Sequence, residues 1–93
     1  MTGDVLDEQW TASPHAAASK VADETVLLHL LSGTYFGLDP LGSKIWQALK
    51  EGQDLRSLGV AIASEHEVSI ERVEADMRLF VAELLKHDLI QAR

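Results

Sequence analysis

Residues 25–42, TVLLHLLSGTYFGLDPLG, contain two short apolar runs, a turn signal between them and a helix start. The first run, residues 25–31, begins with two β-branched residues, and the second, residues 34–38, carries Tyr35 and Phe36. Short apolar runs bounded by turn residues are typical of strands rather than helices. The two-residue connection Ser32-Gly33 predicts a tight hairpin between the two strands.

A third strand is expected at residues 16–22, because Asp23-Glu24 separates this segment from the first run as a turn does. The three segments together predict an antiparallel meander with residues 25–31 in the middle. Nothing later in the sequence resembles another strand. Residues 34–38 are therefore expected to lie at an edge of the sheet.

Three helices are predicted after the strands. Asp39-Pro40 supplies an N-cap and a proline in the first turn, and this helix ends before Gly52. Asp54 caps a second helix that fades out over residues 64–67. Ser69 opens the longest helix, which persists to about His87. The apolar residues at helical spacing are Leu41, Ile45, Trp46 and Leu49 in the first helix, Leu55, Leu58 and Ile62 in the second, and Ile70, Val73, Met77, Phe80, Val81, Leu84 and Leu85 in the third.

This order of elements predicts an α+β fold, in which a three-stranded antiparallel sheet is followed by three helices. The arrangement is typical of a winged helix-turn-helix whose wing strands come first. Residues 1–13 are polar and acidic apart from Val5, Leu6 and Trp10, and show no sustained period. They are expected to form a flexible N-terminal arm, with Trp10 as the candidate anchor, and residues 14–93 are expected to form one domain.

The composition restricts the classes of function. The 93 residues are 46% hydrophobic and 25% charged, which is the balance of a single globular domain. The net charge of −7 argues against nucleic acid and against anionic membranes as partners. The chain has no cysteine, no evident signal peptide and no long apolar run, so we expect a bacterial cytoplasmic protein.

The sequence offers no catalytic or metal-binding motif. Its four histidines are His15, His29, His66 and His87, and none stands three or four residues from another. His66 lies between two glutamates, but adjacent side chains point apart, which favours a solvated loop over a metal site. His29, within an apolar strand, is expected to be partly buried and hydrogen-bonded. Neither a nucleophile elbow nor a glycine-rich phosphate loop is present, so we expect a protein that is not an enzyme and needs no cofactor or metal.

Two features remain to be explained. A free strand edge is usually protected by lysine, proline or a bulge, and residues 34–38 contain neither a lysine nor a proline. Either Tyr35 and Phe36 pack within the sheet, or the edge is open to another chain. The third helix has a wide apolar face, which is either one core stripe between solvated margins or a face on which Val73, Met77 and Phe80 stay partly uncovered as the floor of a groove.

Residues 25–28 (TVLL), residues 32–42 (SGTYFGLDPLG) and Ile45-Trp46 together resemble the PqqD-like family. These small proteins are RiPP recognition elements, which bind the leader segments of ribosomally made, post-translationally modified peptides. Residues 73–90 are similar to the family's third helix, although the family usually has glycine where this chain has Asp88. Within the family, residues 25–42 look most like the stand-alone proteins of lasso-peptide biosynthesis.

The resemblance implies that a leader peptide lies as an added strand on residues 33–38, against the third helix. The peptide-binding residues that it implies are Gly33, Thr34, Tyr35, Phe36, Gly37, Leu38, Val73, Asp76, Met77 and Phe80. The implied function is that of a non-catalytic adaptor, which delivers a precursor peptide to a leader peptidase before a lactam synthetase acts.

Three alternatives stay open. The family's other branch assists radical-SAM enzymes, as in pyrroloquinoline quinone assembly. A small winged-helix DNA-binding regulator would share the architecture but should have a basic recognition helix, whereas residues 54–67 carry one arginine against three acids. The chain could also be a fragment or subunit that completes a larger fold.

Overall fold

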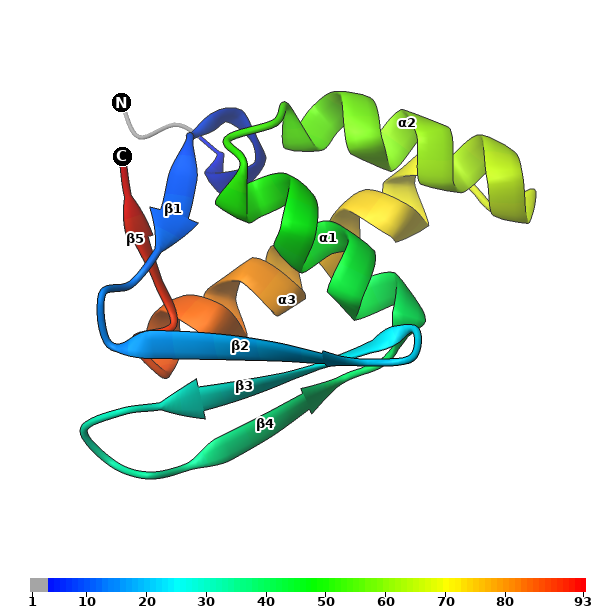
Figure 1. Ribbon diagram of the computed structural model, residues 1–93. Helices are drawn as coiled ribbons and strands as arrows, with labels where there is room; N and C mark the ends of the chain where they lie inside the picture. The colour runs from blue at the N-terminus through cyan, green and yellow to red at the C-terminus, as the bar shows by residue number, and fades with distance from the viewer. Residues whose placement is uncertain (1–3) are drawn as a thin grey trace.

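The computed structural model describes residues 4–93 and confirms the predicted α+β fold, a three-stranded antiparallel sheet followed by three helices (Figure 1). In chain order the elements are the 3-10 turn η1 (Val5–Asp7), the strands β1 (Trp10–Ala12), β2 (Ala16–Val21), β3 (Glu24–His29) and β4 (Tyr35–Leu38), the helices α1 (Pro40–Lys50), α2 (Leu55–His66) and α3 (Ile70–Lys86), and the strand β5 (Ile90–Ala92). Among the described helices, none combines the length and the apolar character needed to cross a membrane.

The strands β2, β3 and β4 form the predicted meander, with β3 in the middle. In the hairpin of β3 and β4, Leu28 lies opposite Tyr35 and Thr25 lies opposite Leu38. The connection between them spans residues 30–34, so the prediction of a two-residue turn was wrong. The longer loop is held by side chains, because Ser32 bonds both to the His29 ring and to the Thr34 hydroxyl.

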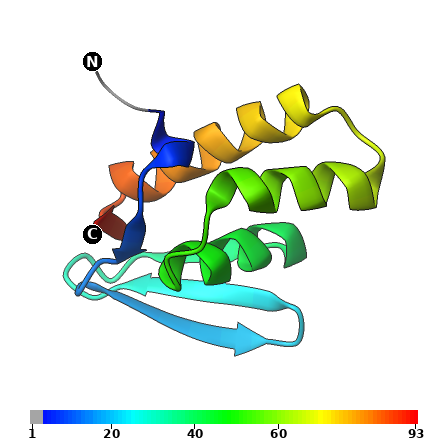
Figure 2. The same ribbon diagram turned by 90° about the horizontal axis from the view of Figure 1, so that it is seen from above.

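The three helices begin where their capping residues predict. The Asp39 carboxylate accepts the Gly42 N–H at 2.7 Å, Asp54 accepts that of Arg56 at 3.0 Å, and Ser69 accepts that of Arg72 at 3.2 Å. Figure 2 shows the helices stacked beside one face of the sheet, with α1 nearest to it and α3 farthest from it.

The core lies between that face of the sheet and the three helices. Leu27 of β3 and Val81 of α3 are fully buried, and Trp46 of α1 is almost so. Most of the residues predicted from the helix periods face the core, including Leu55 and Ile62 on the inner face of α2. Leu41 and Leu85 do not, because they are 41% and 37% exposed. Burial of this apolar surface is the main term that favours the folded state.

The N-terminal segment differs from the flexible arm predicted for residues 1–13. Residues 1–3 lie outside the described residues, but Leu6 and Trp10 are buried in the core. The Trp10 indole N–H also donates to the Val5 carbonyl at 3.0 Å. Two apolar side chains and one satisfied indole are enough to order a segment whose other residues are polar.

A further strand also corrects the prediction that none follows residue 38. β5 pairs antiparallel with β1, so that Trp10 lies opposite Ala92 and Ala12 opposite Ile90. The two strands have three residues each, too short for a period to be read from the sequence. Their pairing brings the two ends of the described chain side by side (Figure 1).

A network of ion pairs fixes η1 to the helices. Arg56 of α2 contacts Asp4, Asp7 and Glu74, and Arg78 of α3 contacts Asp4 at 2.6 Å. The hydrogen bond from Arg78, helped by the Leu6 N–H, lowers the pKa of Asp4 to about 2. The only arginine of α2 is thus occupied by carboxylates of its own chain.

We expect Trp10→Ala to lower the free energy of unfolding by about 3–5 kcal/mol, the usual cost of deleting a buried aromatic side chain. Leu79→Ala is the control, because Leu79 is 68% exposed and should change stability by less than about 0.5 kcal/mol. Urea titration followed by circular dichroism measures both changes. Equal stability of the Trp10→Ala variant and the wild type would show that the segment is a loose arm after all.

Candidate functional site

β4 is an edge strand. Its inner side pairs with β3, and within residues 4–93 no strand pairs with its outer side. The His29 N–H donates to the Thr34 carbonyl at 2.9 Å, and in antiparallel pairs bonded and unbonded residues alternate. Phe36 and Leu38 therefore bond to β3, and Tyr35 and Gly37 direct their main-chain N–H and C=O groups outward. These outward groups form a free template for another strand.

A groove of about 600 Å³ begins where β4 ends. It lies between the C-terminal end of β4 and the three helices, and its lining residues are Gly37, Leu38, Asp39, Leu41, Gly42, Ile45, Ile62, His66, Val68, Arg72, Val73, Asp76, Met77 and Phe80. The lining is mostly apolar, and Leu41 and Val68 remain 41% and 43% exposed at its rim. An apolar concavity with exposed aliphatic side chains at its rim is suited to bind an apolar side chain of a partner.

The helix α3 supplies one wall of the groove, but its residues contribute unequally. Val73 and Met77 line the groove and are only 6% and 1% exposed, so they are core residues whose surfaces form its floor. Phe80 is half-buried and packs against the core from the groove side. Its ring lies near the first turn of α1, where a side chain at Gly42 would meet the Phe80 ring at 3.5 Å.

The predicted site residues fall into two groups. Gly37, Leu38, Val73, Asp76, Met77 and Phe80 come together at the groove. The other four, Gly33, Thr34, Tyr35 and Phe36, lie along the hairpin away from it. Phe36 packs on His87 at the C-terminal end of α3, with ring centroids 4.8 Å apart. Tyr35, in contrast, is 69% exposed on the free strand.

Sequence reasoning missed the contributions of α1, α2 and the turn between α2 and α3. Leu41 and Ile45 were recognised only as residues of an amphipathic helix, and their period does not tell which of them stays uncovered. Val68 follows Glu67, whose backbone is left-handed with φ of 54°, and no pattern marks it. Arg72 and Asp76 stand one turn apart on α3 and place opposite charges at the same wall.

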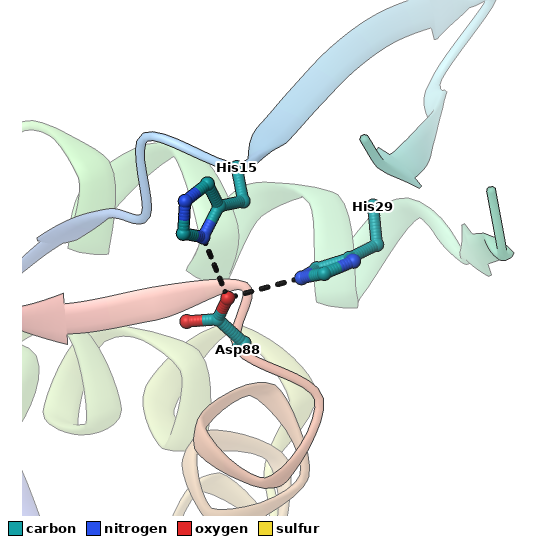
Figure 3. Close-up of side chains that lie close together, drawn as sticks. All are labelled: His15, His29 and Asp88. Atoms are coloured by element: carbon teal, nitrogen blue, oxygen red, sulfur yellow. Dashed lines mark hydrogen bonds and ion pairs between the residues drawn. The ribbon is translucent and has the colours of Figure 1, made fainter. Parts of the chain in front are cut away.

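Outside the groove, three chemically active side chains meet at the other end of β4. The Asp88 carboxylate accepts bonds from the rings of His15 and His29 (Figure 3). The bond from His29, followed by that from His15, lowers the pKa of Asp88. Within residues 4–93, the donor atoms of these three side chains lie close enough together to hold a metal ion. His29 is hydrogen-bonded and its side chain is only 12% exposed, as the sequence predicts.

The comparisons with known proteins extend over most of the chain. Residues 24–90 match the family model described as coenzyme PQQ synthesis protein D (PqqD). No curated protein matches the chain.

Two solved structures are similar to the fold. One shows TbiB1 in complex with the TbiA(beta) leader peptide, at 41% identity and a TM-score of 0.79, over 87% of this chain and 94% of that one. The other shows lasso peptide synthetase B1 complexed with the leader peptide, at 24% identity and a TM-score of 0.83, over 89% of this chain and 98% of that one. The second likeness concerns the fold alone.

Substitutions on α3 can distinguish residues that belong to the core from residues that belong to the groove. We expect Met77→Ala to cost about 2–5 kcal/mol of stability, as for other buried large-to-small changes. Phe80→Ala should cost clearly less, because the Phe80 ring is half-buried at the groove. Thermal and urea unfolding of the two variants measures the difference. A Phe80→Ala variant as unstable as Met77→Ala would place Phe80 in the core and remove it from the site.

Proposed function

The chain belongs to the PqqD family, and we propose that it binds the leader segment of a ribosomally made precursor peptide as an added strand on β4. The observation that carries the proposal is the continuity of a free strand edge with an apolar groove, since Gly37 and Leu38 belong to both. The complex of TbiB1 with a leader peptide supports it, because that protein is 41% identical to this chain.

The sheet has a second edge, β2, and its features favour β4 as the binding edge. β2 carries Lys20 within the strand, and a lysine on an edge strand discourages pairing with another chain. The four residues of β4 include neither lysine nor proline. The apolar groove also adjoins β4, so that only there can main-chain pairing and apolar anchoring act together.

Main-chain pairing gives the leader its direction, and apolar anchors give most of the affinity. A disordered leader loses conformational entropy when it binds, which offsets much of the gain from hydrogen bonds. Each apolar side chain inserted between Leu41, Val68 and Phe80 would contribute roughly 25 cal/mol for each Å² that it buries. The outward groups of Tyr35 and Gly37 would fix the register of the peptide. Gly33, Thr34 and Phe36 would not contact the peptide directly. They would act by holding the hairpin that carries β4.

Charge contributes orientation. Asp76 is exposed at the groove, and the chain has a net charge of −7. A lysine or arginine of the leader would pair with Asp76, which speeds association more than it raises affinity. Arg72, one turn earlier, would form an ion pair with an acidic leader residue, and the two ion pairs together would define the direction of the peptide.

We assign the protein the role of a non-catalytic adaptor in lasso-peptide biosynthesis. It holds the leader for a leader peptidase, and a lactam synthetase acts on the freed core peptide. Binding both the leader and the peptidase raises the local concentration of substrate at an enzyme that itself has little affinity for it. The second candidate, a precursor chaperone for a radical-SAM enzyme, is favoured by the family model, which is named for coenzyme PQQ synthesis.

A proline at Gly37 tests strand addition directly. Gly37→Pro removes an outward N–H and fills the space in front of the edge without removing a bond to β3. Gly37→Ala is the matched control, because a Cβ at this position meets nothing within 4 Å. With the TbiA(beta) leader peptide as the probe, we expect Gly37→Pro to weaken binding by about tenfold or more and Gly37→Ala to leave it unchanged. Fluorescence anisotropy measures binding, and circular dichroism checks the fold.

If the folded Gly37→Pro variant binds the leader as tightly as Gly37→Ala does, strand addition on β4 is wrong.

The pathway is tested by cleavage. We expect the protein to accelerate removal of the leader by a leader peptidase of lasso-peptide biosynthesis at substrate concentrations below the KM of the peptidase alone. Gly37→Pro should lose this acceleration and Gly37→Ala should keep it. Product formation followed by mass spectrometry gives the rate. Acceleration of a radical-SAM enzyme instead, with no effect on a peptidase, would support the second candidate.

A further inference from the structure

Three residues far apart in the sequence converge on one carboxylate oxygen. His15 follows β1, His29 ends β3, and Asp88 lies in the turn between α3 and β5. The Nδ1 atom of His15 and the Nε2 atom of His29 lie 2.9 and 3.0 Å from Oδ2 of Asp88. Figure 3 shows both rings pointing at this atom, from neighbouring segments of the sheet.

We propose that His15, His29 and Asp88 form a binding site for a divalent transition-metal ion of the zinc class. Two imidazole nitrogens and one carboxylate oxygen are a donor set that Zn²⁺ accepts, at about 2.0–2.2 Å from each donor. All three donor atoms lie within 4.8 Å of one another. Donors around a tetrahedral ion stand roughly 3.3 Å apart, which follows from those bond lengths. The ion therefore requires only small shifts of the two rings.

The surroundings of the three donors suit an ion as well. When Nε2 of His29 binds a metal, its Nδ1 must carry the proton and needs an acceptor. The Ser32 hydroxyl lies 3.1 Å from Nδ1 and can accept this proton, but the Ser32 backbone N–H, which donates to the same nitrogen at 3.2 Å, then loses its acceptor. The Ser13 hydroxyl lies 3.4 Å from the second Asp88 oxygen, where it can orient the carboxylate. Side-chain exposures of 44% for His15 and 54% for Asp88 leave room for a water molecule as the fourth donor.

The backbone conformation of Asp88 indicates that its carboxylate has a specific role. Its φ is 55°, in the left-handed region, where glycine is favoured at the end of a helix and a side chain adds strain. Aspartate tolerates this region better than most residues, but it gains over glycine only through what its carboxylate contacts. Here those contacts are the two histidine rings and the Ser13 hydroxyl.

A bound ion would join the β1–β2 connection, the end of β3 and the turn after α3. None of the groove residues takes part, so metal binding and leader binding are tested independently. Because the ion binds only the assembled site, it should raise the melting temperature of the folded protein.

The test is a Zn²⁺ titration of the untagged protein at pH 7.5, in competition with a chromogenic chelator. We expect one ion per chain and a higher Tm in ZnCl₂, which EDTA reverses. Asp88→Gly removes a donor while it relieves the left-handed strain, so this variant should stay folded and bind Zn²⁺ at least about tenfold more weakly. His15→Ala should weaken binding to a similar extent. His66→Ala is the matched control, because His66 stands between two glutamates outside the cluster.

Two results would overturn the proposal. One is a folded Asp88→Gly variant that binds Zn²⁺ with the wild-type affinity and stoichiometry. The other is a loss of binding in His66→Ala as large as in His15→Ala, which would place the ion elsewhere on the surface. Binding that appears only at millimolar Zn²⁺, with no change in Tm, counts equally against the site.

Discussion

Burial of one stripe of α3 is the interaction on which the rest of the structure depends. Val73, Met77, Val81 and Leu84 are each no more than 6% exposed, and they belong to one buried cluster with residues of the sheet, of both other helices and of the terminal strands. The same stripe forms the floor of the groove at its N-terminal end. The site is therefore a part of the core surface that the chain's own helices leave uncovered, and its shape is as rigid as the core.

The elements that the sequence predicted well are those with local signals. Asp39, Asp54 and Ser69 each bond the backbone within the first turn of their own helix, so the starts of the helices could be read from neighbouring residues. The edge position of β4 followed from the number of predicted strands. The β3–β4 loop was misjudged because the Ser-Gly dipeptide does not reveal the bonds of Ser32 to His29 and Thr34 that hold the longer loop.

The features that the sequence did not predict depend on contacts between distant residues. β1 and β5 are too short to show a period, and they pair with each other across almost the whole length of the chain. His15, His29 and Asp88 likewise carry no spacing motif, since 14 and 59 residues separate them and only the fold brings them together. In the groove, helical periods identified the apolar residues but not which of them the neighbouring helices would leave uncovered.

The pairing of Trp10 with Ala92 has a consequence for how such a domain can be combined with others. Both ends of the described chain emerge at one pole, whereas the groove opens between the start of α1, the end of α2 and the start of α3 (Figure 1). A polypeptide linked genetically to either end would start on the side remote from the groove. Covalent fusion to a maturation enzyme is thus sterically compatible with peptide capture, and the length of the tether alone would determine which reaction centre the captured chain can reach.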